Sequence, residues 1–179
     1  EGQEGVPELL IKDLPPTSVE GLEVDQAAIY YGEEMPHYKI VNTGVQELDY
    51  PQGDKNVYTS YQGTGGVQLD SYWKKLLFAF TQGDVNILLS DYPTDESRIQ
   101  YWLPIRERVQ RVAPFLQIDG DPYLVLNDGR LYWIVDAYTT SSSFPYAEPD
   151  QQRNLNYVRN SVKVVVDAYN GSVDIYTVN

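Results

Sequence analysis

The 179-residue sequence contains no cysteine, a single histidine, and 13 basic residues against 26 acidic ones. The absence of cysteine excludes disulfide bonds, thiolate zinc sites and thiol nucleophiles. With one histidine a catalytic zinc site is also disfavoured, and we expect neither a metal nor a cofactor. The net charge of −13 argues against nucleic acid as a partner, because phosphate binding requires clustered lysine and arginine.

Long apolar runs are also missing from the sequence. A membrane-spanning helix needs about 20 apolar residues, whereas the longest run here, residues 76–80, reads Leu-Leu-Phe-Ala-Phe. The sequence shows no secretion signal and opens abruptly with Glu-Gly-Gln-Glu-Gly. We therefore expect a fragment of a longer protein.

Tyrosine, in contrast, is abundant, with 16 copies in a chain whose 42% hydrophobic content is typical of a globular domain. Its side chain joins a large apolar ring to a polar tip, which suits half-buried strands and binding surfaces alike. Strand-rich packing is the simpler interpretation, and a platform for glycans or peptides is the alternative.

The first part of the chain has few regular signals. Residues 1–26 are interrupted by glycine and proline and are predicted to form an extended arm, followed by a single domain over residues 27–179. Aromatic and β-branched content predicts strands at 27–32 and 38–42. Residues 46–66 are predicted to be a loop, with a short strand near Tyr58 and Tyr61.

Apolar residues at helical spacing follow. The first helix is capped by Asp70 or Ser71 and ends at Gly83, and its apolar face contains Trp73, Leu76, Leu77 and Phe80. Residues 85–89 fit a short strand or a further helical turn.

A second helix start is predicted at residues 93–97, with Thr94 as the cap, and Pro114 limits the helix. Pro104 fits a first-turn position in this segment. One side of this helix is predicted to be apolar and to contain Ile105, Val109, Val112 and Ala113. The arginines at positions 106, 108 and 111 are predicted to face outward.

The C-terminal part reads as two hairpins. Strands at 123–126 and 131–135 flank Asn-Asp-Gly, and a strand at 161–169 is predicted to pair with 172–178 across Asn170-Gly171. Residues 139–156 read as a polar loop. The order of elements predicts an α+β fold, a mainly antiparallel sheet with two C-terminal hairpins and two or three helices packed on it.

Few residues suggest catalysis or metal binding. His37 would have to serve any Ser–His–acid relay, but no serine motif lies near it, so we expect a surface histidine. Asp119 and Asp121 form an acidic turn that fits turn chemistry better than calcium. The loop at residues 63–66, Gly-Thr-Gly-Gly, is predicted to be flexible and not a nucleotide cradle. A glycosidase needs two carboxylates, and none of the candidates forms an evident pair: Asp91, Glu107, Asp119, Asp121 and Asp136.

Asp136 and Asp167 each follow an apolar run and precede Ala-Tyr. This repetition favours a structural role, in which each carboxylate accepts backbone N–H groups at the end of a strand. The neighbouring segment is not repeated, and it combines aromatic rings with hydroxyl groups in a pattern that suits a sugar or a polar peptide. The candidate ligand-binding residues are Trp133, Tyr138, Thr139, Thr140, Ser141 and Tyr146.

Many short runs in order make the chain resemble the uncharacterised protein family 0182, a group of large polytopic bacterial membrane proteins. The runs include residues 29–33, 38–43, 47–51, 61–67, 86–90, 97–99, 107–109, 112–116, 121–123, 128–130, 133–141 and 156–163. The resemblance implies a domain on the extracytoplasmic face of the bacterial cell membrane, joined to membrane segments outside this chain. It implies no reaction, ligand or catalytic residue. The sequence departs from the family pattern at Trp102-Leu103, where a basic residue is expected.

Composition and resemblance together predict a non-catalytic extracytoplasmic module of a polytopic membrane protein. Its partner would be another protein, a second copy of itself or a cell-envelope polymer. The alternative is a cell-envelope hydrolase with paired carboxylates. A pocket lined by Trp133, Tyr138 and Tyr146 would favour ligand binding, facing carboxylates roughly 5–10 Å apart would favour glycoside hydrolysis, and an apolar patch would favour assembly.

Overall fold

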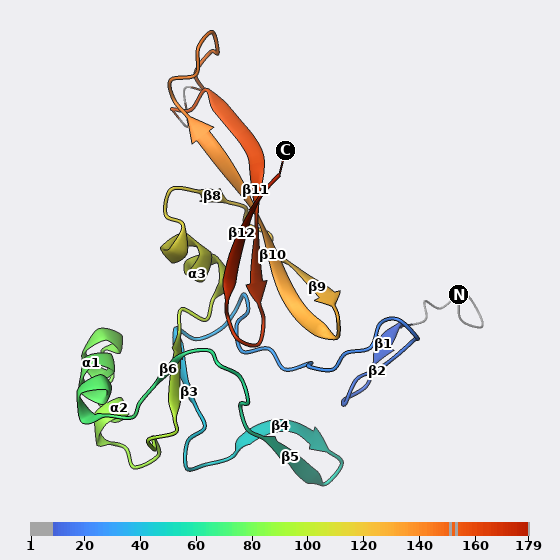
Figure 1. Cartoon of the computed structure of the whole chain (residues 1–179), viewed down its shortest axis with the longest axis vertical. Coiled ribbons are helices and arrows are strands. Elements are labelled where there is room, and N and C mark those ends of the chain that lie inside the picture. Colours follow the sequence, from blue (N-terminus) through green and yellow to red (C-terminus); the bar gives the residue numbers. More distant parts are fainter. Residues whose placement is uncertain (1–8, 151, 153, 179) are drawn as a thin grey trace.

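The computed structural model describes residues 9–150, 152 and 154–178. Figure 1 shows its helices and its several small sheets. In chain order these are β1 (Ile11–Lys12), β2 (Thr17–Ser18), β3 (Tyr38–Val41), β4 (Glu47–Gln52), β5 (Lys55–Thr59), β6 (Val67–Gln68), α1 (Tyr72–Gln82), α2 (Asn86–Leu89), β7 (Arg98–Tyr101), α3 (Ile105–Val112), β8 (Gln117–Ile118), β9 (Tyr123–Asn127), β10 (Arg130–Ser141), β11 (Tyr157–Asp167) and β12 (Val173–Thr177).

The C-terminal sheet has the order β12-β11-β10-β8, and β9 also pairs with β10. All of its pairs are antiparallel. Both predicted hairpins are confirmed, and the positive φ angles of Asp128 (46°), Gly129 (73°) and Gly171 (71°) explain why these residue types occupy the turns. Residues 139–141, predicted to be loop, instead continue β10 and pair with β11. The β10–β11 ribbon therefore extends beyond its neighbours toward one end of the molecule (Figure 1).

A smaller sheet has the order β3-β7-β6. The helix start predicted at residues 93–97 is wrong, because the following residues form β7, whose Ile99 and Gln100 are buried. Ser97 stabilises this path by donating from its Oγ to the carbonyl of Asn42 at 2.8 Å. The α3 helix begins only at Ile105, with Pro104 at the N-cap.

Three further expectations for the N-terminal half need correction. Residues 46–66 contain the β4–β5 hairpin, which turns at Gly53 with φ of 59°. No named strand covers 27–32; instead the amides of Tyr30 and Tyr31 donate to the carbonyl of Ala168. The described part of the predicted arm contains the small β1–β2 pair, and residues 1–8 lie outside the described residues.

The loop at residues 63–66 is fastened to its surroundings. The Arg98 guanidinium donates to the carbonyls of Thr64, Gly65 and Gly66 at 2.8–2.9 Å. A Cβ added to Gly65 would lie 2.4 Å from the carbonyl oxygen of Asn170. The glycines therefore permit close packing, and the predicted flexibility is wrong.

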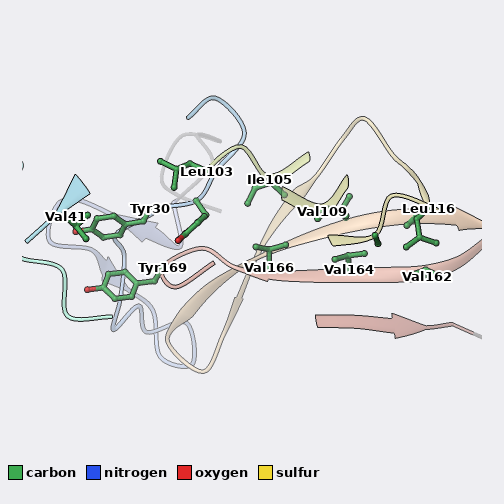
Figure 2. Packing of buried hydrophobic residues seen from close by; sticks show 14 of the residues in the cluster. Tyr30, Val41, Leu103, Ile105, Val109, Leu116, Val162, Val164, Val166 and Tyr169 are labelled. Carbon is green, nitrogen blue, oxygen red and sulfur yellow. The ribbon is translucent and has the colours of Figure 1, made fainter. Parts of the chain in front are cut away.

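The main core lies between α3 and one face of the C-terminal sheet. Figure 2 shows Val162, Val164 and Val166 along β11. They face Ile105 and Val109 of α3 and Leu116, which follows the helix. Alternation along β11 directs these valines inward, and the helix offers Ile105 and Val109 in return. Arg108, predicted to face outward, is half-buried: its Nε donates to the carbonyl of Gly171 at 2.6 Å.

Three tyrosine rings bring together the segments that precede β3, follow β5 and follow β11. Tyr30 packs edge-on against Tyr61 and Tyr169, with centroids 4.8 and 5.2 Å apart. The Tyr61 hydroxyl donates to Asn170 Oδ1 at 3.0 Å, and the Tyr169 hydroxyl accepts from the amide of Gln62 at 2.9 Å. We call these three rings the tyrosine joint. These three tyrosines therefore serve packing, which is the simpler of the two interpretations given for the tyrosine content.

An alkaline transition is expected from the buried hydroxyls. Burial raises the pKa of Tyr31 to about 12, and burial together with Asp84 does the same for Tyr38. In the unfolded chain these groups ionise near the ordinary value of 10.0. The contribution of these two tyrosines to the free energy of unfolding is thus complete below pH 10 and falls as pH rises toward 12. Ultraviolet titration of tyrosinate should show a late-ionising class that disappears in denaturant; uniform ionisation near pH 10 in the native protein would contradict this.

Candidate interaction surface

The predicted ligand-binding residues are spread along β10 and the loop beyond it. Trp133 is partly buried against the core, and its Nε1 donates to the carbonyl of Tyr31 at 2.9 Å. Since a strand rises about 3.3 Å per residue, Ser141 lies roughly 26 Å from Trp133. Tyr138 instead donates its hydroxyl to Asp119 Oδ2 at 2.6 Å. Tyr146 is fully exposed with φ of 60°, so these residues form no common pocket.

The loop after β10 nevertheless has some internal order. The Phe144 ring stacks on Tyr157 at 4.4 Å, and Asn156 bonds to the Phe144 backbone through both its amide and carbonyl groups. Thr139 Oγ1 lies 2.9 Å from Ser161 Oγ on β11, whereas Thr140 is exposed. The hydroxyl groups of this segment therefore face solvent or a neighbouring strand, and sugar or peptide binding there stays a prediction.

The two repeated aspartates have different roles. Asp167 Oδ1 accepts from the amides of Tyr169 (2.8 Å) and Asn170 (2.9 Å), so the predicted strand-end role is confirmed there. Its Oδ2 also pairs with Arg130 at 2.7 Å. The prediction is wrong for Asp136, which lies inside β10 and pairs with Lys163 on the adjacent strand.

The candidate catalytic groups are engaged separately. His37 is 80% exposed and lies 3.1 Å from Glu107 Oε2. Hydrogen bonds from Tyr138 and from the amide of Gly120 hold the pKa of Asp119 below its ordinary value, which makes this carboxyl a poor proton donor near neutral pH. Within residues 9–150, 152 and 154–178, no group of three or more His, Asp or Glu side chains is placed to hold a metal ion.

The bounds of α1 follow the sequence prediction. Ser71 caps the helix by accepting from the Lys74 amide at 3.4 Å, and Gly83 ends it in the left-handed conformation, with φ of 69°. The direction in which its side chains point is the unexpected feature. The residues predicted to form the apolar face of this helix are exposed, with 75% of Trp73, 58% of Leu77 and 85% of Phe80 accessible to solvent.

A different stripe of α1 faces the protein. Lys75, Phe78, Ala79 and Gln82 repeat at the same helical spacing, and each lies two positions after a residue of the apolar stripe. Ala79 is buried against Leu69, Ile87 and Ile99, and the small side chain lets the helix approach them closely. Lys75 Nζ donates to the carbonyl of Pro93 at 3.1 Å. The helix is thus anchored by its more polar stripe, while the more apolar stripe points outward.

We call the outward stripe, Trp73, Leu76, Leu77 and Phe80, the α1 surface. Figure 1 places α1 at the outer edge of the molecule, away from the C-terminal sheet. Tyr72 is also exposed and packs edge-on against Trp73 at 6.0 Å. Tryptophan and tyrosine are enriched among residues that dominate binding energy at interfaces. Sequence periodicity identified this stripe correctly, but it could not show which stripe the rest of the fold would cover.

An apolar groove lies beside α2. Its volume is about 490 Å³, and its walls come from β3, α2 and the segment after α2: Tyr38, Ile40, Thr43, Val45, Asp84, Asn86, Ile87, Ser90, Tyr92 and Pro93. Tyr38 donates its hydroxyl to Asp84 across the groove. Val45 and Tyr92, at its rim, are 56% and 64% exposed. Apolar exposure is therefore not confined to α1 on this part of the molecule.

Comparisons with known proteins identify long relatives. The chain is 57% identical to a UPF0182 protein of Salinibacter ruber over 188 aligned residues, covering 100% of this chain and 20% of the relative. It is 52% identical to a UPF0182 protein of Pelotomaculum thermopropionicum, covering 97% and 19%. The chain thus spans about a fifth of the length of these curated relatives.

The remaining findings concern solved structures, membrane-spanning helices and the family model. No solved structure matches the chain. Among the helices in the described parts of the chain, none has the length and apolar character to cross a membrane. The model of the uncharacterised protein family UPF0182 matches residues 1–179. With that match over its whole length and with such similar relatives, the chain belongs to the uncharacterised protein family UPF0182.

Proposed function

We propose that this chain is a non-catalytic extracytoplasmic module of a bacterial membrane protein, and that it docks on protein through the α1 surface. The observation that carries this proposal is the orientation of α1, whose most apolar stripe faces outward. Its extracytoplasmic location is supported by the sequence runs that resemble large polytopic membrane proteins.

Exposure of this stripe has an energetic consequence. Fully burying one leucine or phenylalanine side chain contributes about 1.5–3 kcal/mol relative to leaving it in water. Three of the four side chains of the α1 surface are more than half exposed, and they repeat on one side of one helix. Contiguous apolar surface of this kind marks interaction sites in soluble domains. A covering protein would gain most of this free energy.

The first test compares two leucines of nearly equal exposure. Leu77 on α1 is 58% exposed and Leu48 on β4 is 59% exposed. We expect Leu77→Ser and Leu48→Ser each to change the free energy of unfolding of the isolated chain by no more than about 0.5 kcal/mol. Urea denaturation measures both. If Leu77 faced the core, its loss would cost about 2–5 kcal/mol, and that result would contradict the orientation on which the proposal depends.

The second test asks whether the surface is covered in a longer protein. Amide hydrogens of α1 should exchange more slowly in the full-length Salinibacter ruber relative than in the 179-residue chain alone. The β4–β5 hairpin serves as the internal control, because the proposal predicts no change in its exchange. Equal exchange of α1 in both proteins would show a bare helix and would overturn the docking proposal.

A further inference from the structure

Four kinds of partner suit an exposed apolar helix face: a separate protein, a second copy of the chain, the lipid surface, or another segment of the same polypeptide. We infer that the α1 surface packs against an amphipathic helix of the same polypeptide, outside the 179 residues of this chain. This inference rests on the proposed docking function and names its partner.

The net charge disfavours a second copy and the lipid surface as partners. Each copy of the chain has a net charge of −13, so two copies repel each other unless a large interface compensates. The same charge opposes approach to an anionic lipid surface, which attracts basic segments. A covalently attached segment has no such encounter to overcome, because it is already held near α1.

The size of the surface points the same way. A stable interface between independent proteins uses roughly 20–30 residues on each side, whereas the α1 surface consists of four large side chains on two helical turns. Tethering raises the effective concentration of a segment to about the millimolar range, so a small contact suffices. The family relatives provide the necessary sequence, since this chain spans only about a fifth of their length.

The spacing of the stripe defines the chemistry of the partner segment. Trp73, Leu76, Leu77 and Phe80 form rows at i, i+3, i+4 and i+7, and such rows interlock with the grooves of a facing helix. The partner helix should therefore have leucine or aromatic side chains at the same spacing. It should contain few acidic residues, because this chain has an excess of 13 negative charges.

Photo-crosslinking in the full-length Salinibacter ruber relative tests the inference. Benzoylphenylalanine replaces the residue aligned with Phe80, and a matched variant has it at the position aligned with Leu48, which is also exposed. The protein is prepared as a mixture of heavy-isotope and unlabelled molecules. We expect crosslinks from the Phe80 position to one sequence outside the matched region, with both peptides always of the same isotopic label. The Leu48 position should give no such product.

Each other outcome overturns a defined statement. Crosslinked peptides of mixed label would identify a second copy, and crosslinks to a different protein would identify a separate partner. Either result refutes the same-polypeptide partner and leaves the docking function intact. Crosslinking to lipid, or no crosslink at all, would refute both. The isolated 179-residue chain should also sediment as a monomer across a concentration series. A concentration-dependent dimer that Leu77→Ser abolishes would refute the inference independently.

Discussion

Replacing Asp167 with alanine is expected to lower the free energy of unfolding by about 2–3 kcal/mol, mainly because two backbone amides lose their acceptor. The Asp167 side chain is 8% exposed and bonds to two amides of the turn after β11 as well as to Arg130. Alanine leaves the amide of Tyr169, in a residue only 9% exposed, without its acceptor. The Arg130 guanidinium also loses its carboxylate, but its side chain is 40% exposed, so the lost ion pair adds only about 0–1 kcal/mol. Urea denaturation of the isolated chain measures the loss.

Asp136 provides the matched control, because it has the same Val-Asp-Ala-Tyr context in the sequence. Its partner Lys163 is 34% exposed, and an ion pair that solvent reaches contributes about 0–1 kcal/mol. Asp136→Ala should therefore be close to neutral. Equal losses of stability for the two alanine variants would mean that Asp136 and Asp167 have the same structural role, which would contradict the geometry.

Replacing Gly171 with alanine is expected to lower the free energy of unfolding by about 2–5 kcal/mol. The φ angle of 71° strains any L-residue, which accounts for about 1–2 kcal/mol. In addition, the new Cβ would lie 2.4 Å from Cζ of Tyr31, whose ring is 1% exposed and cannot swing into solvent. Overpacking of this kind adds about 1–3 kcal/mol.

Gly53 separates the two contributions. It also has a positive φ, 59°, but an added Cβ meets nothing within 4 Å. Gly53→Ala should therefore show the backbone strain alone, about 1–2 kcal/mol. The difference between the two variants measures the contact with Tyr31, and it is obtained from denaturation curves analysed with a common slope. If the variants were equally destabilised, the close approach of Gly171 to Tyr31 would be refuted.

Local signals in the sequence predicted local features of the fold well. The turns at Asp128-Gly129 and Asn170-Gly171 were predictable because their conformations depend on the residues themselves. The ends of α1 were predictable for the same reason, since Ser71 and Gly83 act within one turn of helix. The α+β class followed from the order of these elements.

Features set by distant contacts were not predictable. The segment after Thr94 has helix-start residues, yet β7 forms there because it pairs with β3 and β6 on either side. Asp136 looked like a strand end because the contacts that extend β10 come from β11, which lies beyond the intervening loop. The outward direction of the α1 surface depended on which stripe the smaller sheet would accept. The one sequence signal for the inward stripe was the small side chain of Ala79, which is the only buried residue of α1.

The tyrosine joint has a consequence for the order of events during synthesis. Tyr61 meets Asn170 across 109 positions of sequence, and Trp133 meets Tyr31 across 102. Contacts this distant slow folding, because a long loop must close before they form. The ribosome makes the N-terminal part first, so Tyr30 and Tyr61 cannot pack against Tyr169 until residue 169 has been translated. During that interval the nascent chain presents unburied aromatic rings, and exposed apolar surface of this kind favours aggregation of partly folded chains.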